Sequence, residues 1–121
     1  MKPIGPTAHG IIDYGAVLLL VLAPFLLNLE RTPSQILYLL AGILGILTMM
    51  TAFRPGLLKL IPFPVHGGFD LVTSVIVAAL PWILGFSDQT TARNLFLCIT
   101  AMLVGVWLLT DWRSRDGLAL T

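Results

Sequence analysis

Charge is scarce in this chain, which has only 11% charged residues among its 121. An average soluble domain has roughly 25%. Hydrophobic residues make up 57% of the chain. A soluble domain this small buries a limited share of its surface on folding, so it could not hide that much apolar surface from water. The composition therefore excludes an ordinary soluble domain and predicts a membrane protein.

Several motifs that carry chemistry are also missing. The single cysteine, Cys98, has no partner for an internal disulfide and no CxxC neighbour. The formal net charge of +1 gives no basis for a nucleic-acid partner. No phosphate-binding glycine loop, nucleophile elbow or HExxH motif occurs, so nothing in the sequence predicts an enzyme.

Long apolar runs are what the chain does contain. Each is close to the roughly 20 residues that a helix needs to cross a bilayer. Backbone groups in lipid must be satisfied within the segment, so the runs predict helices. The first run has two nearby prolines and an aspartate and no small-residue cleavage site, and we expect it to be retained. The predicted fold class is an all-α integral membrane four-helix bundle, with spans at about 8–29, 35–53, 67–86 and 92–112.

Basic residues are distributed unequally between the two sides of these spans. Five of the seven lie on the side that holds both termini: Lys2, Arg54, Lys59, Arg113 and Arg115. The other two, Arg31 and Arg93, lie in the opposite loops. The excess of lysine and arginine marks the cytoplasmic side, so both termini are predicted to be cytoplasmic.

The chain repeats itself at a shift of 57 residues. At that shift Lys2, Ile4, His9, Gly10, Asp13 and Pro24 coincide with Lys59, Ile61, His66, Gly67, Asp70 and Pro81. The second helices align at a shift of 59, where Thr51-Ala52-Phe53-Arg54 meets Thr110-Asp111-Trp112-Arg113. The repeating unit is a two-helix hairpin, and two such units enter the membrane from the same side as parallel repeats.

The repeat gives a division of the chain into four parts. Residues 2–54 form the first two-helix membrane repeat, and residues 55–66 form a cytoplasmic interfacial loop. Residues 67–113 form the second membrane repeat, whose unit begins near 59, and residues 114–121 form a cytoplasmic tail.

This pattern resembles the SPW-repeat family of small bacterial integral membrane proteins, whose unit is two transmembrane helices with Ser-Pro-Trp in the first. The corresponding residues here are Ala23-Pro24-Phe25 and Leu80-Pro81-Trp82, so the serine is absent from both copies and the tryptophan from one. The resemblance covers residues 2–113. It implies the hairpin-repeat architecture and a multi-pass location in the bacterial cytoplasmic (inner) membrane, and it implies no biochemical activity.

Each repeat begins with an HGxxD motif, at residues 9–13 and 66–70. The motifs contain both histidines of the chain. On a helix, His9 and Asp13 lie on one face, and Pro24 falls on the same face three turns later. His66, Asp70 and Pro81 repeat that relation. We expect this stripe to face protein, and we expect Pro24 and Pro81 to kink their helices because proline removes a backbone donor.

Four interpretations of the HGxxD motifs stay open at this point. They could be structural polar clusters that anchor helix starts at the membrane surface, with each histidine near protein acceptors. They could form a divalent metal site from His9, Asp13, His66 and Asp70, because imidazole and carboxylate suit Zn²⁺ and similar ions. They could line a proton or ion path. Haem ligation by the two histidines is the least favoured, because they lie at helix starts.

Small residues predict where helices approach each other closely. Ala41, Gly45, Thr48 and Ala52 form one face of the second helix, and Ala101 and Gly105 form another on the fourth. Such faces can also serve a neighbouring chain. Besides the lipid bilayer, we therefore expect a homo-oligomer or a membrane-protein partner, and a non-enzymatic role in assembly.

Overall fold

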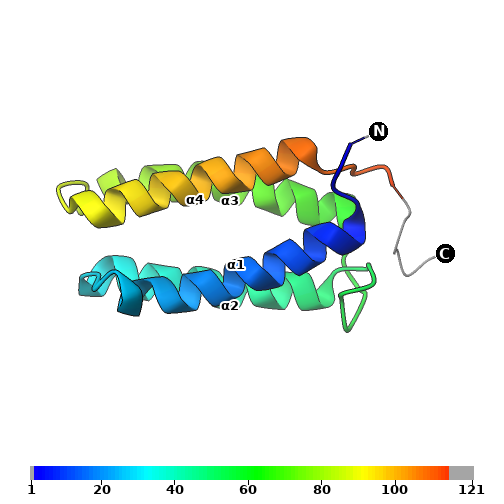
Figure 1. Cartoon of the computed structure of the whole chain (residues 1–121), viewed down its shortest axis with the longest axis horizontal. Coiled ribbons are helices and arrows are strands. Elements are labelled where there is room, and N and C mark those ends of the chain that lie inside the picture. The colour runs from blue at the N-terminus through cyan, green and yellow to red at the C-terminus, as the bar shows by residue number, and fades with distance from the viewer. Residues whose placement is uncertain (1, 115–121) are drawn as a thin grey trace.

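The computed structural model describes residues 2–114, and within that range the chain forms four α-helices and no β-strand. They are α1 (Pro6–Leu26), α2 (Arg31–Met50), α3 (Phe63–Ile83) and α4 (Thr90–Leu109). Helix α1 packs along α2, and α3 packs along α4 (Figure 1). The predicted all-α bundle of two hairpins is confirmed. All four helices are long and apolar enough to cross a membrane, which makes this a multi-pass membrane protein by length and composition.

The helices start earlier than the apolar runs predicted. Helix α1 begins at Pro6, and α3 begins at Phe63 with Pro64 as its second residue. Proline is well suited to the first turn, because the amide N–H that it lacks has no partner there in any helix. The segment predicted as the end of a loop at 63–66 is therefore the first turn of α3. His66 lies in that turn, and its backbone N–H donates to the carbonyl of Pro62.

The predicted polar stripe faces protein in both hairpins. His9, Asp13 and Pro24 are buried along α1, as are their counterparts along α3. Pro24 and Pro81 lie in the last turns of their helices, and their carbonyls accept hydrogen bonds from Leu29 and Phe86 at 3.0 and 2.8 Å. The prolines therefore stand where each helix ends and the chain turns back; the kinks stay a prediction.

Apolar packing fills the half of the bundle that contains the α1–α2 and α3–α4 loops. A cluster of buried side chains from all four helices and the second hairpin loop makes this core: Leu20, Leu37, Ala41, Val77, Phe86, Ala92 and Phe96. The rings of Phe86 and Phe96 meet edge to face at 5.1 Å. Many other apolar side chains point outward, among them Phe25 with 82% of its surface exposed. Outward apolar side chains are expected where the surrounding solvent is lipid.

Two short backbone pairings join the hairpins at the other end. Ile4, before α1, pairs in parallel with Thr110, after α4. Ile61, before α3, pairs in the same way with Thr51, after α2. Hydrogen bonds of 2.7–3.1 Å support both pairings. The two junctions occupy equivalent positions in the sequence repeat, and they bring the start of α1 and the end of α4 together (Figure 1).

Candidate metal centre

The two HGxxD motifs occupy the first turns of α1 and α3. In each motif the histidine and the aspartate are four residues apart, so both side chains leave the helix on the same face. Asp70 is seven residues after the start of α3, which places it about 10 Å along a helix that rises about 1.5 Å per residue. Because α1 and α3 start at the same end of the bundle, the motifs lie at the same depth (Figure 1).

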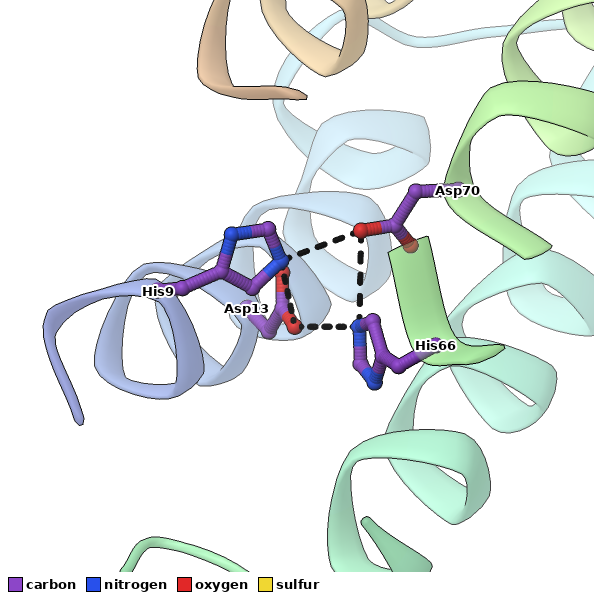
Figure 2. A group of neighbouring side chains, drawn as sticks. All are labelled: His9, Asp13, His66 and Asp70. Atoms are coloured by element: carbon purple, nitrogen blue, oxygen red, sulfur yellow. Dashed lines mark hydrogen bonds and ion pairs between the residues drawn. The ribbon is translucent and has the colours of Figure 1, made fainter. Parts of the chain in front are cut away.

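The structure brings these motifs together as a single cluster, in which each histidine contacts both aspartates (Figure 2). His9 Nε2 is 3.0 Å from Asp70 Oδ2 and 3.4 Å from Asp13 Oδ2. His66 Nε2 is 2.9 Å from Asp13 Oδ2 and 3.4 Å from Asp70 Oδ2. The four groups form a closed ring in which imidazole and carboxylate alternate, called the His/Asp ring below. Its two shortest contacts run between the hairpins.

The His/Asp ring is shielded from its surroundings. The histidines are 0–1% exposed and the aspartates 5%. Although Asp13 Oδ2 is only 2.9 Å away, the Nε2 atom of His66 has no hydrogen-bond partner with acceptable geometry among residues 2–114. The two atoms are close enough for an ion pair, but a hydrogen bond also requires the N–H to point at the acceptor oxygen, and here it does not. A buried nitrogen left without a directed partner, close to two carboxylate oxygens, is a feature that a bound cation would explain.

Two threonines determine which nitrogen of each histidine faces the ring. The hydroxyl of Thr51 lies 2.7 Å from Nδ1 of His66, and that of Thr110 lies 2.9 Å from Nδ1 of His9. Each hydroxyl also donates its only hydrogen to a backbone carbonyl four residues earlier, at 2.6 Å. The threonine oxygen must therefore accept a hydrogen bond from Nδ1–H of the histidine. A neutral imidazole, the form that binds a metal ion, would then direct the lone pair of Nε2 into the ring. Without an ion, the 3.0 Å hydrogen bond between His9 Nε2 and Asp70 Oδ2 is one that the imidazole donates, because a carboxylate oxygen only accepts.

Aromatic rings cover the His/Asp ring at the end of the bundle where α1 starts and α4 ends. Phe63 and Trp112 contact His9, with ring centroids 5.4 and 4.9 Å apart. Phe53 lies 5.9 Å from His66 and is fully buried. Buried aromatic groups on this side exclude water from the site and lower the local dielectric constant, which strengthens every electrostatic contact within it.

The glycines of the two motifs make this cover possible. A Cβ atom added at Gly10 would lie 2.6–2.9 Å from Pro55 and Phe53, and one added at Gly67 would lie 2.8 Å from Trp112. Both distances are too short for carbon atoms that are not bonded. The groups that approach the glycines are Pro55 and the aromatic side chains of Phe53 and Trp112, from the segments that follow α2 and α4.

The donor set and its dimensions suit a divalent transition ion. No two of the four donor atoms are more than 4.8 Å apart. A tetrahedral Zn²⁺ shell with bonds of about 2.0–2.1 Å places neighbouring donors about 3.3 Å apart. The four His–Asp contacts, at 2.9–3.4 Å, match that spacing, while the widest separation requires the ring to contract across its diagonal. One divalent cation would also neutralise the two carboxylates.

Sequence reasoning missed the two threonines that orient the histidines. Thr51 and Thr110 were visible as members of the repeat, but nothing in the sequence placed them beside the histidines of the opposite hairpin. Aromatic residues near helix ends often form an interfacial belt, but Phe53 is fully buried and belongs to the cover of the site. Trp82 and Tyr38, which are about half exposed, fit the belt.

The small-residue face of α2 is packed against another helix, whereas that of α4 is not. Ala41 and Thr48 are buried, and a Cβ at Gly45 would come within 3.8 Å of Val17 on α1. That face packs inside the first hairpin, as expected. On α4, Ala101 is exposed, and no atom lies within 4 Å of a Cβ built at Gly105. Within the described chain, this second face has room for a close neighbour: Ala101 is exposed and Gly105 is partly exposed.

Comparison with known proteins identifies no relative: no family model matches the chain, and neither a curated protein nor a solved structure is significantly similar to it. The resemblance to SPW-repeat proteins stays a prediction.

Proposed function

We propose that this protein holds one divalent transition-metal ion, such as Zn²⁺, at His9, Asp13, His66 and Asp70, and that the ion joins its two membrane hairpins. The observation that carries the proposal is the arrangement of the histidines, whose Nδ1 atoms donate to Thr110 and Thr51 while both Nε2 atoms face two carboxylates. Hydrogen bonds from the second ring nitrogen fix metal-binding histidines in this way in many proteins.

A structural ion fits this site better than a catalytic one. Four protein ligands complete a tetrahedral shell, whereas catalytic zinc sites keep one position open for water or substrate. Most helix packing lies within each hairpin, while the contacts of the His/Asp ring run between hairpins. The proposed role is therefore a joint inside a non-enzymatic membrane protein. The sequence contains no phosphate-binding loop, nucleophile elbow or HExxH motif, so it gives no reason to propose catalysis.

A proton or ion path has less support. A path across the membrane needs polar groups at successive depths. Beyond the His/Asp ring, the outer halves of α1 and α3 read LLLVLAPFL and VIVAALPWI, which contain no ionisable residue. Proton or ion transport is therefore not the function that we propose.

Location and assembly are proposals of the same kind. The excess of lysine and arginine on the side of both termini supports a cytoplasmic position for both ends, and the hairpin repeat supports a bacterial inner-membrane protein of the SPW-repeat type. The Ala101–Gly105 face of α4 would suit a second copy or a membrane-protein partner. Binding of a second copy or a partner to that face would not require the metal ion.

Elemental analysis tests the metal proposal directly. The protein is purified in detergent without chelators, its affinity tag is removed, and its metal content is measured by mass spectrometry. We expect about one divalent ion per chain, because all four ligands come from one chain. Alanine at any of the four ligands should abolish the content. Ser74→Ala is the matched control, because Ser74 is buried one turn beyond Asp70 and donates only to a backbone carbonyl.

Two results would contradict the proposal. One is a well-folded protein that contains no ion and takes up none when Zn²⁺, Co²⁺ or Mn²⁺ is added. The other is a metal content that His66→Ala leaves unchanged, because the ion would then be bound elsewhere.

A further inference from the structure

An apolar cavity of about 340 Å³ lies among the four helices, next to the His/Asp ring. Its walls include Leu20, Leu44, Val77 and Met102, one from each helix. At one end is Asp70, the only ionisable side chain in the wall apart from the thiol of Cys98. The other end reaches Leu27, just after the last residue of α1. The volume is at the lower end of the range for small-molecule pockets, about 300–1,000 Å³.

The position of the cavity restricts what can fill it. It runs along the membrane-spanning part of the bundle, and apolar walls of this kind do not hold water. An occupant must therefore be mostly apolar and must enter from the bilayer. The end at Asp70 requires in addition a small polar group, because a carboxylate that faces hydrocarbon is unfavourable.

The two aspartates differ in a way that the repeat makes visible. Asp13 does not line the cavity, and the hydroxyl of Thr48 lies 3.4 Å from its Oδ2 atom. The residue in the equivalent position of the second hairpin is Trp107, whose indole N–H donates to the carbonyl of Gly67. No protein hydroxyl is therefore hydrogen-bonded to Asp70, and among residues 2–114 its polar contacts are with the two histidines, both through Oδ2. No side chain of the described residues bonds to its other oxygen, and Asp70 is part of the cavity wall.

We propose that the cavity binds a single-chain lipid-soluble alcohol, whose hydroxyl donates a hydrogen bond to Asp70 and whose apolar tail extends toward Leu27. An anionic head group would be repelled by the carboxylate. A charged or bulky head group would have to leave water to reach this depth. A neutral hydroxyl satisfies the carboxylate without either penalty. The proposal does not depend on the metal ion, because the donor uses the oxygen of Asp70 that the histidines leave free.

Photo-crosslinking of the full-length protein in detergent tests this proposal. The probe is a dodecanol that carries a diazirine in the middle of its chain. We expect saturable labelling that maps to buried residues of the cavity wall, such as Leu20 and Val77. Unlabelled dodecanol should compete at least about tenfold better than its methyl ether, which cannot donate, because hydrogen bonds to charged groups are among the stronger ones.

The repeat supplies a matched pair of variants. Asp70→Leu should reduce dodecanol to the potency of the ether, while Asp13→Leu removes the same charge and the same candidate ligand and should leave the preference intact. The metal content of both samples is measured as well, so a failure of the metal proposal appears separately. Comparison of alcohol and ether on the unmodified protein needs no variant, and it decides the question even if Asp70→Leu does not fold.

Three outcomes would overturn the proposal. Equal competition by alcohol and ether would exclude recognition of the hydroxyl. Unsaturable labelling that extends to outward residues such as Phe25 and Leu39 would mean that ordinary lipid contact alone is being detected. Equal loss of preference in both leucine variants would mean that the alcohol is recognised by the whole ring and not through the cavity.

Discussion

The Nδ1 atom of His9 lies 2.9 Å from the hydroxyl oxygen of Thr110, although the two residues are 101 positions apart. That hydroxyl donates to the carbonyl of Val106 at 2.6 Å, so the histidine is the hydrogen-bond donor. The contact joins the first turn of α1 to the residue after the end of α4, and it fixes the ring orientation that directs Nε2 at the two carboxylates.

Removal of that acceptor should weaken the proposed metal site without removing a ligand. Thr110→Val keeps the shape of the side chain, and we expect a loss of about 10–100-fold in Zn²⁺ affinity, as for other groups that orient metal-binding histidines. Competition against a chelator of known affinity measures the change. Thr100→Val is the control, because Thr100 also donates to the carbonyl four residues earlier on α4 but has no contact with the site. An equal effect of both substitutions would contradict the assigned role.

Chelation should lower the thermal stability of the metal-loaded protein. A ligand that binds only the folded state contributes about 2.7 kcal/mol at a concentration of 100 times its Kd, so its removal lowers Tm. Differential scanning fluorimetry with and without chelator measures the shift, and added Zn²⁺ should restore it. In His66→Ala neither treatment should change Tm. A Tm of the loaded protein that does not respond to chelator would exclude a stabilising ion.

The glycine beside the second histidine should not tolerate a methyl group. In Gly67→Ala the new Cβ would lie 2.8 Å from the ring of Trp112, whose position is held by a hydrogen bond from its indole N–H to the carbonyl of Trp107. Overpacking of this kind costs about 1–3 kcal/mol. The next residue is an internal control, because a Cβ at Gly68 meets nothing within 4 Å. We expect Gly67→Ala to lower Tm clearly and Gly68→Ala to leave it equal or slightly higher; the reverse order would contradict the packing.

The number of helices, the hairpin repeat and the ligand candidates could all be predicted from the sequence. Lipid requires long apolar helices, and the rare residues His9, Asp13, His66 and Asp70 stand out against an apolar background. The helix starts, by contrast, were predicted too late, because they were placed at the first residues of the apolar runs. Pro6 and Pro64 lie before those runs but belong to the first turns of α1 and α3, where the missing N–H has no consequence.

The fusion of both motifs into one ring could not be predicted. It depends on how far apart the axes of α1 and α3 lie, and side-chain packing across the whole bundle determines that distance. The repeat shows that the motifs are equivalent, but equivalent groups can lie side by side or on opposite faces. The same limit applies to Thr51 and Thr110, which belong to one hairpin and contact the histidine of the other.

The proposed orientation can be tested by labelling from one side of the membrane. In a Cys98→Ser background, we expect Lys2→Cys to be protected from a membrane-impermeant maleimide in intact cells and Glu30→Cys to be labelled. Residue 2 precedes α1, whereas Glu30 lies in the loop between α1 and α2 at the opposite end of the bundle (Figure 1). Labelling of residue 2 alone would mean that the chain is inserted in the other direction.

If the ion joins the hairpins, the joint should hold after the covalent connection is cut. A protease site inserted between Leu57 and Leu58 would lie in the α2–α3 loop, where both leucines are more than 60% exposed. After cleavage, the backbone pairings of Ile4 with Thr110 and of Thr51 with Ile61 would remain, together with the His/Asp ring. The shortest ring contacts, at 2.9 and 3.0 Å, connect different hairpins, so an ion bound there would hold the two fragments directly. We expect the cleaved, metal-loaded fragments to elute together in size-exclusion chromatography and to separate when chelator is added.

Cleaved His66→Ala should separate without chelator, whereas cleaved Ser74→Ala should behave like the unmodified protein. Fragments that stay together to the same extent with and without chelator would show that packing and the backbone pairings suffice, and the ion would lose its role as a joint.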